Sequence, residues 1–273
     1  MSKVKTATAG LIERIERIME VNKIYNEDCM KTMERLHDID CVLTSPPYNT
    51  DRGGGNLSDH SQRYESFEDY KSDEEYIEWT IGLFKSFDKI LKKDGCVLYN
   101  ISYSARRPAM MWNLIAAIQS QTCFEVADCI IWKKPSALPS NTNYNKLTRL
   151  CEFVFVFCRA SEQDTFKCYK GVSSESPVGQ SYYNNAYNFI EAPNNDENCP
   201  IHKATYSSLL CRKLMLLYTA EGDTIYDPFM GTGTTAIACI KEKRNYVGSE
   251  LSERYVEWAE KRIWKEQRQL TLF

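Results

Sequence analysis

The sequence predicts an α/β protein in which a mostly parallel sheet carries helices on both faces. Short apolar stretches with strand character alternate with longer segments whose apolar residues recur every three or four positions. Two of the apolar stretches run directly into segments that end a strand, one rich in proline and one rich in glycine. Because parallel strands are joined by crossover connections that are usually helical, this alternation favours a doubly wound sheet.

Four helices and four strands are expected before residue 135. Helices are assigned where apolar side chains recur at helical spacing, and strands where short apolar runs end at turn residues. The long third helix is expected to stop at Asp94-Gly95, because glycine readily takes the left-handed conformation that ends helices. In chain order the expected elements are helix 8–21, strand 23–26, helix 29–36, strand 40–44, a mobile polar loop 50–66, helix 69–93, strand 96–101, helix 110–120 and strand 124–132.

The second half of the chain is expected to return to the same sheet. Residues 151–158 alternate apolar and aromatic side chains and predict a strand. The surrounding segment 136–200 is rich in Asn, Ser, Tyr and Pro without a sustained period, which indicates an inserted subdomain. The remaining expected elements are a helix through 209–217, strand 224–226, a glycine-rich turn over 227–233, a helix from 234, strand 245–248 and helix 252–268.

Composition and charge exclude several classes of protein. The 273 residues carry 34 Lys and Arg against 37 Asp and Glu, a net charge of −3, so a polyanion partner must be held by a local basic patch. No apolar run reaches the ~20 residues of a membrane helix, and no signal-peptide pattern follows the N-terminus, so a cytoplasmic protein without a membrane partner is expected. The 11 cysteines show no Cys-x-x-Cys spacing, so no metal site is expected.

The motif Asp227–Thr235 contains the glycine-rich turn between a predicted strand and a predicted helix. Glycines allow a ligand to approach the backbone closely, and a helix N-terminus presents free N–H groups. Glu250, 19 residues after Gly231, ends the next strand, where a carboxylate suits two ribose hydroxyls. The turn therefore predicts a site for a nucleoside-containing cofactor. Since Gly231-x-Gly233-x-x-Ala236 also fits the dinucleotide fingerprint, an NAD-dependent oxidoreductase stays open, as does a simple tight turn.

The proline-rich segment Thr44–Asn49 ends another predicted strand. Its two prolines fix the backbone, so that the Ser45 hydroxyl and the Pro46 carbonyl form a rigid pair of acceptors. Tyr48 beside them offers a flat stacking face. Acceptors next to a stacking face suit the exocyclic amino group of a flipped-out base. The alternative is a proline-rich strand exit whose tyrosine belongs to the core.

Together these motifs resemble the DNA amino-methyltransferases, which methylate N6 of adenine or N4 of cytosine from S-adenosylmethionine. Ser45-Pro46-Pro47-Tyr48 is similar to their catalytic (Asp/Asn/Ser)-Pro-Pro-(Tyr/Phe) motif, and Asp227–Thr235 to their Asp-Pro-Phe-x-Gly-x-Gly-Thr-Thr cofactor motif. The catalytic motif comes first, which is the β-type order. Residues 26–29 resemble the family's Gly-Asp-Cys segment, and 202–207 resemble its His-x-Ala-x-Phe-Pro segment, with Ser207 in place of the proline.

The resemblance implies a Rossmann-like, seven-stranded, mostly parallel sheet of the class I methyltransferase fold with a small target-recognition insertion. It divides the chain into a catalytic half over 1–135, to which 150–158 return, the insertion over 136–200, and a cofactor-binding half over 201–273. Catalysis is assigned to Ser45, Pro46, Pro47 and Tyr48. The cofactor contacts that it implies are Asp28, Thr205, Tyr206, Asp227, Phe229, Gly231, Gly233, Thr234, Thr235 and Glu250.

The implied substrate is double-stranded DNA, bound by basic residues at the borders of the insertion and in one further loop. Basic groups would hold phosphates. The candidates are Arg106, Arg107, Lys133, Lys134, Lys146 and Arg149. Ser45 favours N4 of cytosine, because family members with serine in this position more often act there, and N6 of adenine stays open. A companion restriction endonuclease and a homodimer are both left open.

The expected mechanism is direct methyl transfer to a base that has left the stack. No cysteine lies in a nucleophile motif, which argues against methylation of cytosine C5. A non-catalytic nucleic-acid-binding module remains the alternative from a different class. Catalysis makes one spatial demand: two segments about 180 positions apart must meet at one edge of the sheet.

Overall fold

One large sheet forms the centre of the molecule, and its strands come from both halves of the chain. The computed structural model describes residues 20–49, 71–103, 107–136, 144–145, 147–176, 180–196 and 206–270. Over these residues the sheet has eight strands in the order β1-β10-β9-β2-β3-β5-β4-β8. The strands are β1 Lys23–Tyr25, β2 Ile39–Thr44, β3 Leu91–Ile101, β4 Phe124–Lys133, β5 Cys151–Arg159, β8 Phe189–Glu191, β9 Thr224–Asp227 and β10 Asn245–Ser249.

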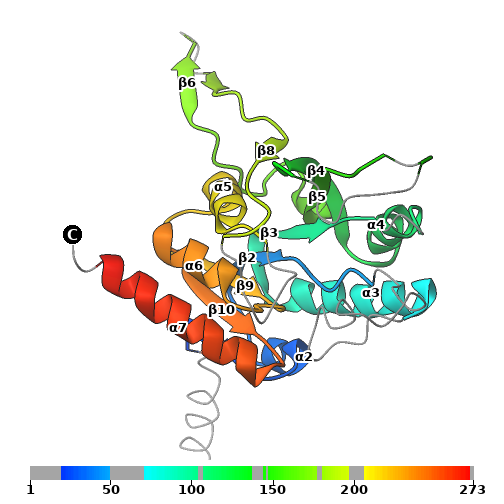
Figure 1. The fold of residues 1–273 in the computed structure, drawn as a ribbon. Helices are drawn as coiled ribbons and strands as arrows, with labels where there is room; N and C mark the ends of the chain where they lie inside the picture. The colour runs from blue at the N-terminus through cyan, green and yellow to red at the C-terminus, as the bar shows by residue number, and fades with distance from the viewer. Residues whose placement is uncertain are drawn as a thin grey trace, which may run out of the picture.

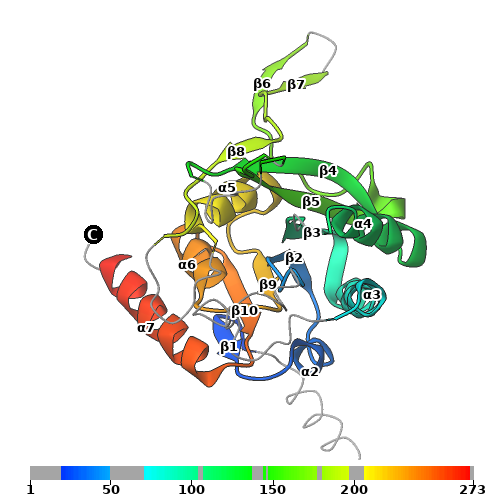
Figure 2. The ribbon, with the colours of Figure 1, turned by 45° about the vertical axis from the view of Figure 1, so that its right-hand side comes forward.

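Helices cover both faces of this sheet (Figures 1 and 2). One face packs against α2 Cys29–Met33, α3 Asp73–Ile90 and α4 Met110–Gln121, and the other against α5 Ser208–Tyr218, α6 Thr234–Lys241 and α7 Glu253–Leu270. Successive residues of a strand point to opposite faces, so Val42 joins the first core and Leu43 the second. Both faces are covered by helices, which explains why the central strands are rich in apolar residues.

The predicted fold class is confirmed, with one more strand than expected. All neighbouring strands pair in parallel except β5, which runs antiparallel to both β3 and β4. The eighth strand is β8, which extends the sheet at β4 through the pair Trp132 and Ile190. It lies within 136–200, so part of the segment interpreted as an insertion belongs to the main sheet. Burial of Ile190 and pairing of the exposed edge of β4 both favour this addition.

The long helix predicted over 69–93 ends earlier, at Ile90, and its expected stop at Asp94-Gly95 is wrong. Leu91 is already extended and pairs with Ile39 at the start of β3. The guanidinium of Arg159, at the end of β5, donates to the carbonyls of Asp88 and Leu91 at 2.8 and 3.0 Å. These carbonyls at the end of the helix therefore have hydrogen-bond partners without a further helical turn. Asp94, with φ of 60°, makes a turn inside β3 instead.

A two-stranded antiparallel ribbon projects from the body of the molecule (Figures 1 and 2). It consists of β6 Val172–Glu175 and β7 Ser181–Tyr183, both within the predicted insertion. Its tyrosines Tyr182 and Tyr183 are exposed. The helix expected over 8–21 and the loop expected over 50–66 lie outside the described residues. No helix in the described part of the chain is long and apolar enough to cross a membrane.

Candidate active site

The two sequence motifs meet at one edge of the sheet, as predicted from the sequence. Strands β2 and β9 are parallel neighbours, paired through Val42 and Tyr226, and each ends at a motif (Figure 1). Thr44, the last residue of β2, donates from its Oγ1 to Oδ1 of Asp227, the last residue of β9, at 2.9 Å. The expected juxtaposition of residues about 180 positions apart is therefore confirmed.

Asp227 organises this junction from a fully buried position. Besides Thr44, its carboxylate accepts hydrogen bonds from the Phe229 amide at 3.0 Å and from the side chains of Tyr206 and Thr235. Burial raises the pKa of the Asp227 carboxyl, while these donors lower it. Asp227, Tyr206 and Thr235 thus bond to one another, and any contact that they make with a cofactor stays a prediction.

Helix α3 holds both motifs from the same side. The Tyr76 hydroxyl donates to the Pro47 carbonyl at 2.7 Å, which fixes the proline-rich segment. One turn further, the Trp79 ring lies 5.6 Å from the Phe229 ring of the glycine-rich turn, measured between centroids. These contacts fix the positions of two segments that share no strand, and sequence patterns gave no sign of either.

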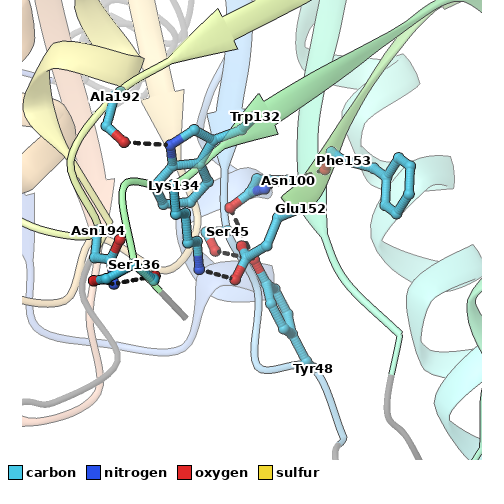
Figure 3. Close-up of polar contacts among 10 residues, drawn as sticks. All are labelled: Ser45, Tyr48, Asn100, Trp132, Lys134, Ser136, Glu152, Phe153, Ala192 and Asn194. Atoms are coloured by element: carbon cyan, nitrogen blue, oxygen red, sulfur yellow. Dashed lines mark hydrogen bonds and ion pairs between the residues drawn. The ribbon is translucent and has the colours of Figure 1, made fainter. Parts of the chain in front are cut away.

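The side chains of Ser45 and Tyr48 take part in a polar network shown in Figure 3. The Tyr48 hydroxyl lies 3.0 Å from Ser45 Oγ, 2.8 Å from Asn100 Oδ1 and 2.9 Å from Glu152 Oε2. Glu152 also forms an ion pair with Lys134. The side chains of Lys134 and Glu152 are largely buried, 19% and 16% exposed. The proline-rich segment therefore carries two hydroxyls, those of Ser45 and Tyr48, and the second is hydrogen-bonded to the largely buried Glu152 carboxylate.

Sequence patterns did not indicate Asn100 or Glu152. Ligands of parallel sheets gather at the carboxyl ends of the strands, and Glu152 comes instead at the start of its strand. Strand β5 runs antiparallel, so its first residues, Cys151 and Glu152, lie at that same edge. Asn100 lies near the end of β3 and is completely buried, with its side-chain amide donating to the Phe153 carbonyl at 3.1 Å. A buried asparagine in an apolar strand was the available signal.

The two glycines of the turn have different roles. Gly231, with φ of 53°, donates its amide to Glu250 Oε2 at 2.9 Å. Gly233, with φ of 85°, faces helix α7, and a Cβ placed there would lie 2.9 Å from the Ala259 Cβ. The missing side chain of Gly233 thus makes room for α7, and a cofactor contact by Gly231 or Gly233 stays a prediction.

We expect Gly233→Ala to lower the free energy of unfolding by about 3 kcal/mol, measured by urea denaturation. The left-handed conformation accounts for about 1 kcal/mol and overpacking against Ala259 for about 2 kcal/mol. Gly222→Ala is the matched control, because Gly222 has φ of 86° and open space around its Cβ position. It should cost only about 1 kcal/mol. Equal losses in the two variants would contradict the packing role of Gly233.

Glu250, the residue expected to hold a ribose, lies against the glycine-rich turn. Its carboxylate accepts from the Gly231 amide and from the Ser252 amide, both at 2.9 Å. Burial raises the pKa of the Glu250 carboxyl. Nearby, the Thr232 hydroxyl is buried and has no hydrogen-bond partner among the described residues. The end of β10 and the turn therefore bring together a half-buried carboxylate and an unsatisfied hydroxyl.

The other predicted cofactor residues are placed as follows. Asp28 is exposed and caps α2, its Oδ1 accepting from the Met30 amide at 2.8 Å, which is the structural role considered from the sequence. Thr234 begins α6 and is buried, with Arg262 donating to its hydroxyl at 3.4 Å. Thr205 lies outside the described residues. A cofactor contact by Asp28 or Thr234 stays a prediction.

Most predicted DNA-binding cations are engaged within the chain. Arg107 forms an ion pair with Asp73 and donates to the Asn49 carbonyl, so it supports the proline-rich segment. The other pairings are Lys133 with Glu191, Lys134 with Glu152, and Arg149 over the Tyr103 ring at 5.0 Å. Arg106 and Lys146 lie outside the described residues. Within the described residues, no group of three or more His, Cys, Asp or Glu side chains is placed to hold a metal ion.

Comparisons with known proteins agree with this architecture. The N6/N4 family model described as DNA methylase matches residues 39–261. The Type II methyltransferase M.Cfr9I from Citrobacter freundii is 26% identical over 96% of this chain and 96% of its own length. Among solved structures, the cytosine-N4-specific PvuII DNA methyltransferase superposes with a TM-score of 0.67 at 18% identity, covering 92% of this chain and 93% of that chain. A putative DNA modification methylase from Thermus thermophilus, complexed with S-adenosyl-L-methionine, gives 0.59 at 18% identity over 89% and 93%.

Proposed function

The chain belongs to the N6/N4 DNA methylase family, and we propose that it transfers a methyl group from S-adenosylmethionine to an exocyclic amino group in double-stranded DNA. The observation that carries this proposal is the hydrogen bond from Thr44 to Asp227, which joins the ends of β2 and β9. Under this proposal, an amino-group acceptor pair and a nucleoside site share one edge of the sheet. Neither site alone would support methyl transfer, because the donor and the acceptor must meet.

The residues of the glycine-rich turn fit S-adenosylmethionine. Glu250 retains free lone pairs on both carboxylate oxygens after accepting the two amides, which suits the two hydroxyls of a ribose. Thr232 adds a buried hydroxyl that lacks a partner among the described side chains. When bound, S-adenosylmethionine supplies an electrophilic methyl carbon on a positively charged sulfur.

The chain's own residues orient and activate the amino group. Ser45 Oγ and the Pro46 carbonyl accept its two hydrogens, which directs the nitrogen lone pair away from the base plane. Tyr48 offers its ring for stacking, and its hydroxyl is held at 2.8 Å by Asn100. The base must leave the duplex to reach this pocket. Rate enhancement then rests on positioning and fixed dipoles.

Cytosine N4 is the proposed target atom, on the ground of Ser45 in the first motif position. The projecting ribbon of β6 and β7, with exposed Tyr182 and Tyr183 and with Lys170 5.9 Å from the Tyr183 ring, is the proposed DNA-contacting element. Lys133 and Arg149 remain proposed phosphate contacts, because both lie at the borders of the insertion. Lys133 would exchange its partner Glu191 for a phosphate.

The test is transfer of a labelled methyl group to duplex DNA, followed by mass spectrometry of the modified nucleoside. We expect N4-methylcytosine, with labelling of DNA about 10³-fold slower when Ser45 is replaced by alanine. N6-methyladenine would replace the cytosine assignment with the adenine one. Saturable binding of NAD without binding of S-adenosylmethionine, or labelling of RNA alone, would overturn the proposed function.

We expect Glu250→Ala to weaken S-adenosylmethionine binding by about 10²-fold in isothermal titration calorimetry, since two hydrogen bonds to a charged group are lost. Glu257→Ala, at a carboxylate 62% exposed on α7, is the control and should leave the affinity unchanged. Because burial raises the pKa of Glu250, wild-type affinity should fall as the pH is lowered toward that raised value. Glu250→Gln should abolish this dependence. A Glu250→Ala variant with wild-type affinity would contradict the assignment.

A further inference from the structure

The Tyr48 hydroxyl faces two acceptors with a single proton. Asn100 Oδ1 lies at 2.8 Å and Glu152 Oε2 at 2.9 Å, and a phenol can donate only one hydrogen bond. Asn100 cannot turn its amide toward Tyr48 instead, because that amide donates to the Phe153 carbonyl. Whenever Glu152 is ionised, one of the two acceptors therefore receives no hydrogen bond from Tyr48.

Glu152 has a specific partner on one of its two carboxylate oxygens. Lys134 forms an ion pair with its Oε1, so that Oε2 alone faces Tyr48 (Figure 3). The Lys134 ammonium also lies 4.5 Å from the Trp132 ring centroid, which fixes its direction. The arrangement therefore combines a largely buried carboxylate with a phenol oxygen within hydrogen-bond distance of it.

Ser45 extends this arrangement to the substrate. Its Oγ lies 3.0 Å from Tyr48 Oη. For Ser45 to accept from an amino group, its own proton must point elsewhere, and Tyr48 Oη is the acceptor within reach. The order of the hydrogen bonds is thus amino group to Ser45, Ser45 to Tyr48, and Tyr48 to Glu152.

Methyl transfer produces one surplus proton. It forms an N–C bond at the amino nitrogen, breaks the S–C bond with the electron pair left on sulfur, and leaves a positive charge on nitrogen. We propose that Glu152 is the acceptor of this proton through Ser45 and Tyr48. The amino N–H breaks as Ser45 Oγ takes its proton, the Ser45 proton passes to Tyr48, and the Tyr48 proton passes to Glu152.

Atoms and charge balance in this transfer without any group from outside the chain and its substrates. One N–H bond is lost, one O–H bond is gained on Glu152, and the carboxylate charge cancels the positive charge left on nitrogen. The added proton also lets both neighbours of Tyr48 form a hydrogen bond at the same time. Protonated Glu152 donates to the phenol oxygen, and the phenol donates to Asn100. Since the Glu152 side chain is 16% exposed, it returns the proton to water afterwards.

The inference rests on the proposed methyl transfer, and two substitutions test it in single-turnover assays at saturating DNA. Tyr48→Phe keeps the stacking ring and removes the hydroxyl. Glu152→Gln keeps a hydrogen bond to each of Lys134 and Tyr48 but cannot take up a proton. Each should lower the rate by about 10²-fold with an unchanged KM, and the double variant should lose no more than either single one.

The control is Glu257→Gln. Glu257 forms an exposed ion pair with Lys261 on α7, 3.9 Å long. It makes no contact with Tyr48 among the described residues. Its rate should equal that of the wild type. If Tyr48→Phe keeps the wild-type rate, or if the losses of Tyr48→Phe and Glu152→Gln multiply, the relay is overturned.

A second readout uses the free protein, without DNA or cofactor. With ¹³C-labelled tyrosine rings, the Tyr48 signal is identified by its loss in Tyr48→Phe. Three polar groups surround the phenol and the carboxylate among the described residues: Lys134 from the end of β4, Ser45 after β2 and Asn100 in β3. Glu152→Gln leaves all three in place.

On acidification the Tyr48 signal should shift in the wild type and stay constant in Glu152→Gln. A constant wild-type signal would overturn the relay. A wild type that transfers no methyl group would instead overturn the proposed function, so the two failures are distinguishable.

Discussion

Replacing Ser45 by alanine is expected to lower the single-turnover rate of methyl transfer by about 10³-fold. The hydroxyl accepts from the amino group and is the first member of the path that removes its proton. Loss of one fixed partner of developing charge costs about 3 to 4 kcal/mol in other enzymes. Quenched-flow measurement with labelled S-adenosylmethionine and duplex DNA gives this rate directly.

The fold should tolerate the change, because Ser45 is half-buried and its described hydrogen bond joins only Tyr48. Ser45→Asp is the matched comparison, since it keeps an acceptor that the family motif also allows, and it should retain more activity than Ser45→Ala. Both variants should bind S-adenosylmethionine with wild-type affinity. A Ser45→Ala enzyme that works at the wild-type rate would remove Ser45 from the catalytic assignment.

Replacing Asp227 by alanine is expected to lower the free energy of unfolding by about 3 kcal/mol. The substitution leaves the buried donors of Thr44, Tyr206 and Thr235 without their acceptor. Asp227→Asn should cost only about 1 kcal/mol, because the hydroxyls can rotate to accept from the new amide. Thr44→Val removes a single bond and should also cost about 1 kcal/mol. Urea denaturation of the three variants provides the comparison.

The pH dependence of stability distinguishes the contribution of the Asp227 charge from that of its size and hydrogen bonds, which asparagine largely retains. Because burial raises the pKa of Asp227 in the folded state, the folded protein binds a proton over a window just above the ordinary value of 3.8. Stability relative to Asp227→Asn should therefore rise as the pH falls through that window. A difference that shrinks on acidification would contradict a carboxyl destabilised by burial.

The sequence was sufficient for the parts of the site that lie on parallel strands. Proline at position 46 and glycine at position 231 each follow a strand, and the rule that such strand ends share an edge brought the two motifs together. It was insufficient for Glu152, because no local pattern tells an antiparallel strand from a parallel one. The position of Gly233 against Ala259 likewise depends on how α7 packs, which a glycine pattern does not contain.

The helix that ends at Ile90 illustrates the same limit. Asp94-Gly95 is a good local stop, yet Arg159, 68 positions beyond Leu91, satisfies the terminal carbonyls and allows β3 to begin at once. Tertiary hydrogen bonds thus displaced the boundary that local propensity favours. The same applies to Lys134 and Arg107, whose charges suggested phosphate contacts but which bind carboxylates of the chain.

We propose that the ends of β2 and β9 form one site for both the methyl donor and the base. A crystal structure of the protein with S-adenosylhomocysteine would test this shared site. We expect the ribose hydroxyls on the Glu250 carboxylate and the sulfur facing Ser45 Oγ across the Thr44–Asp227 junction. A nucleoside bound away from this edge, with Ser45 facing only solvent, would contradict the account.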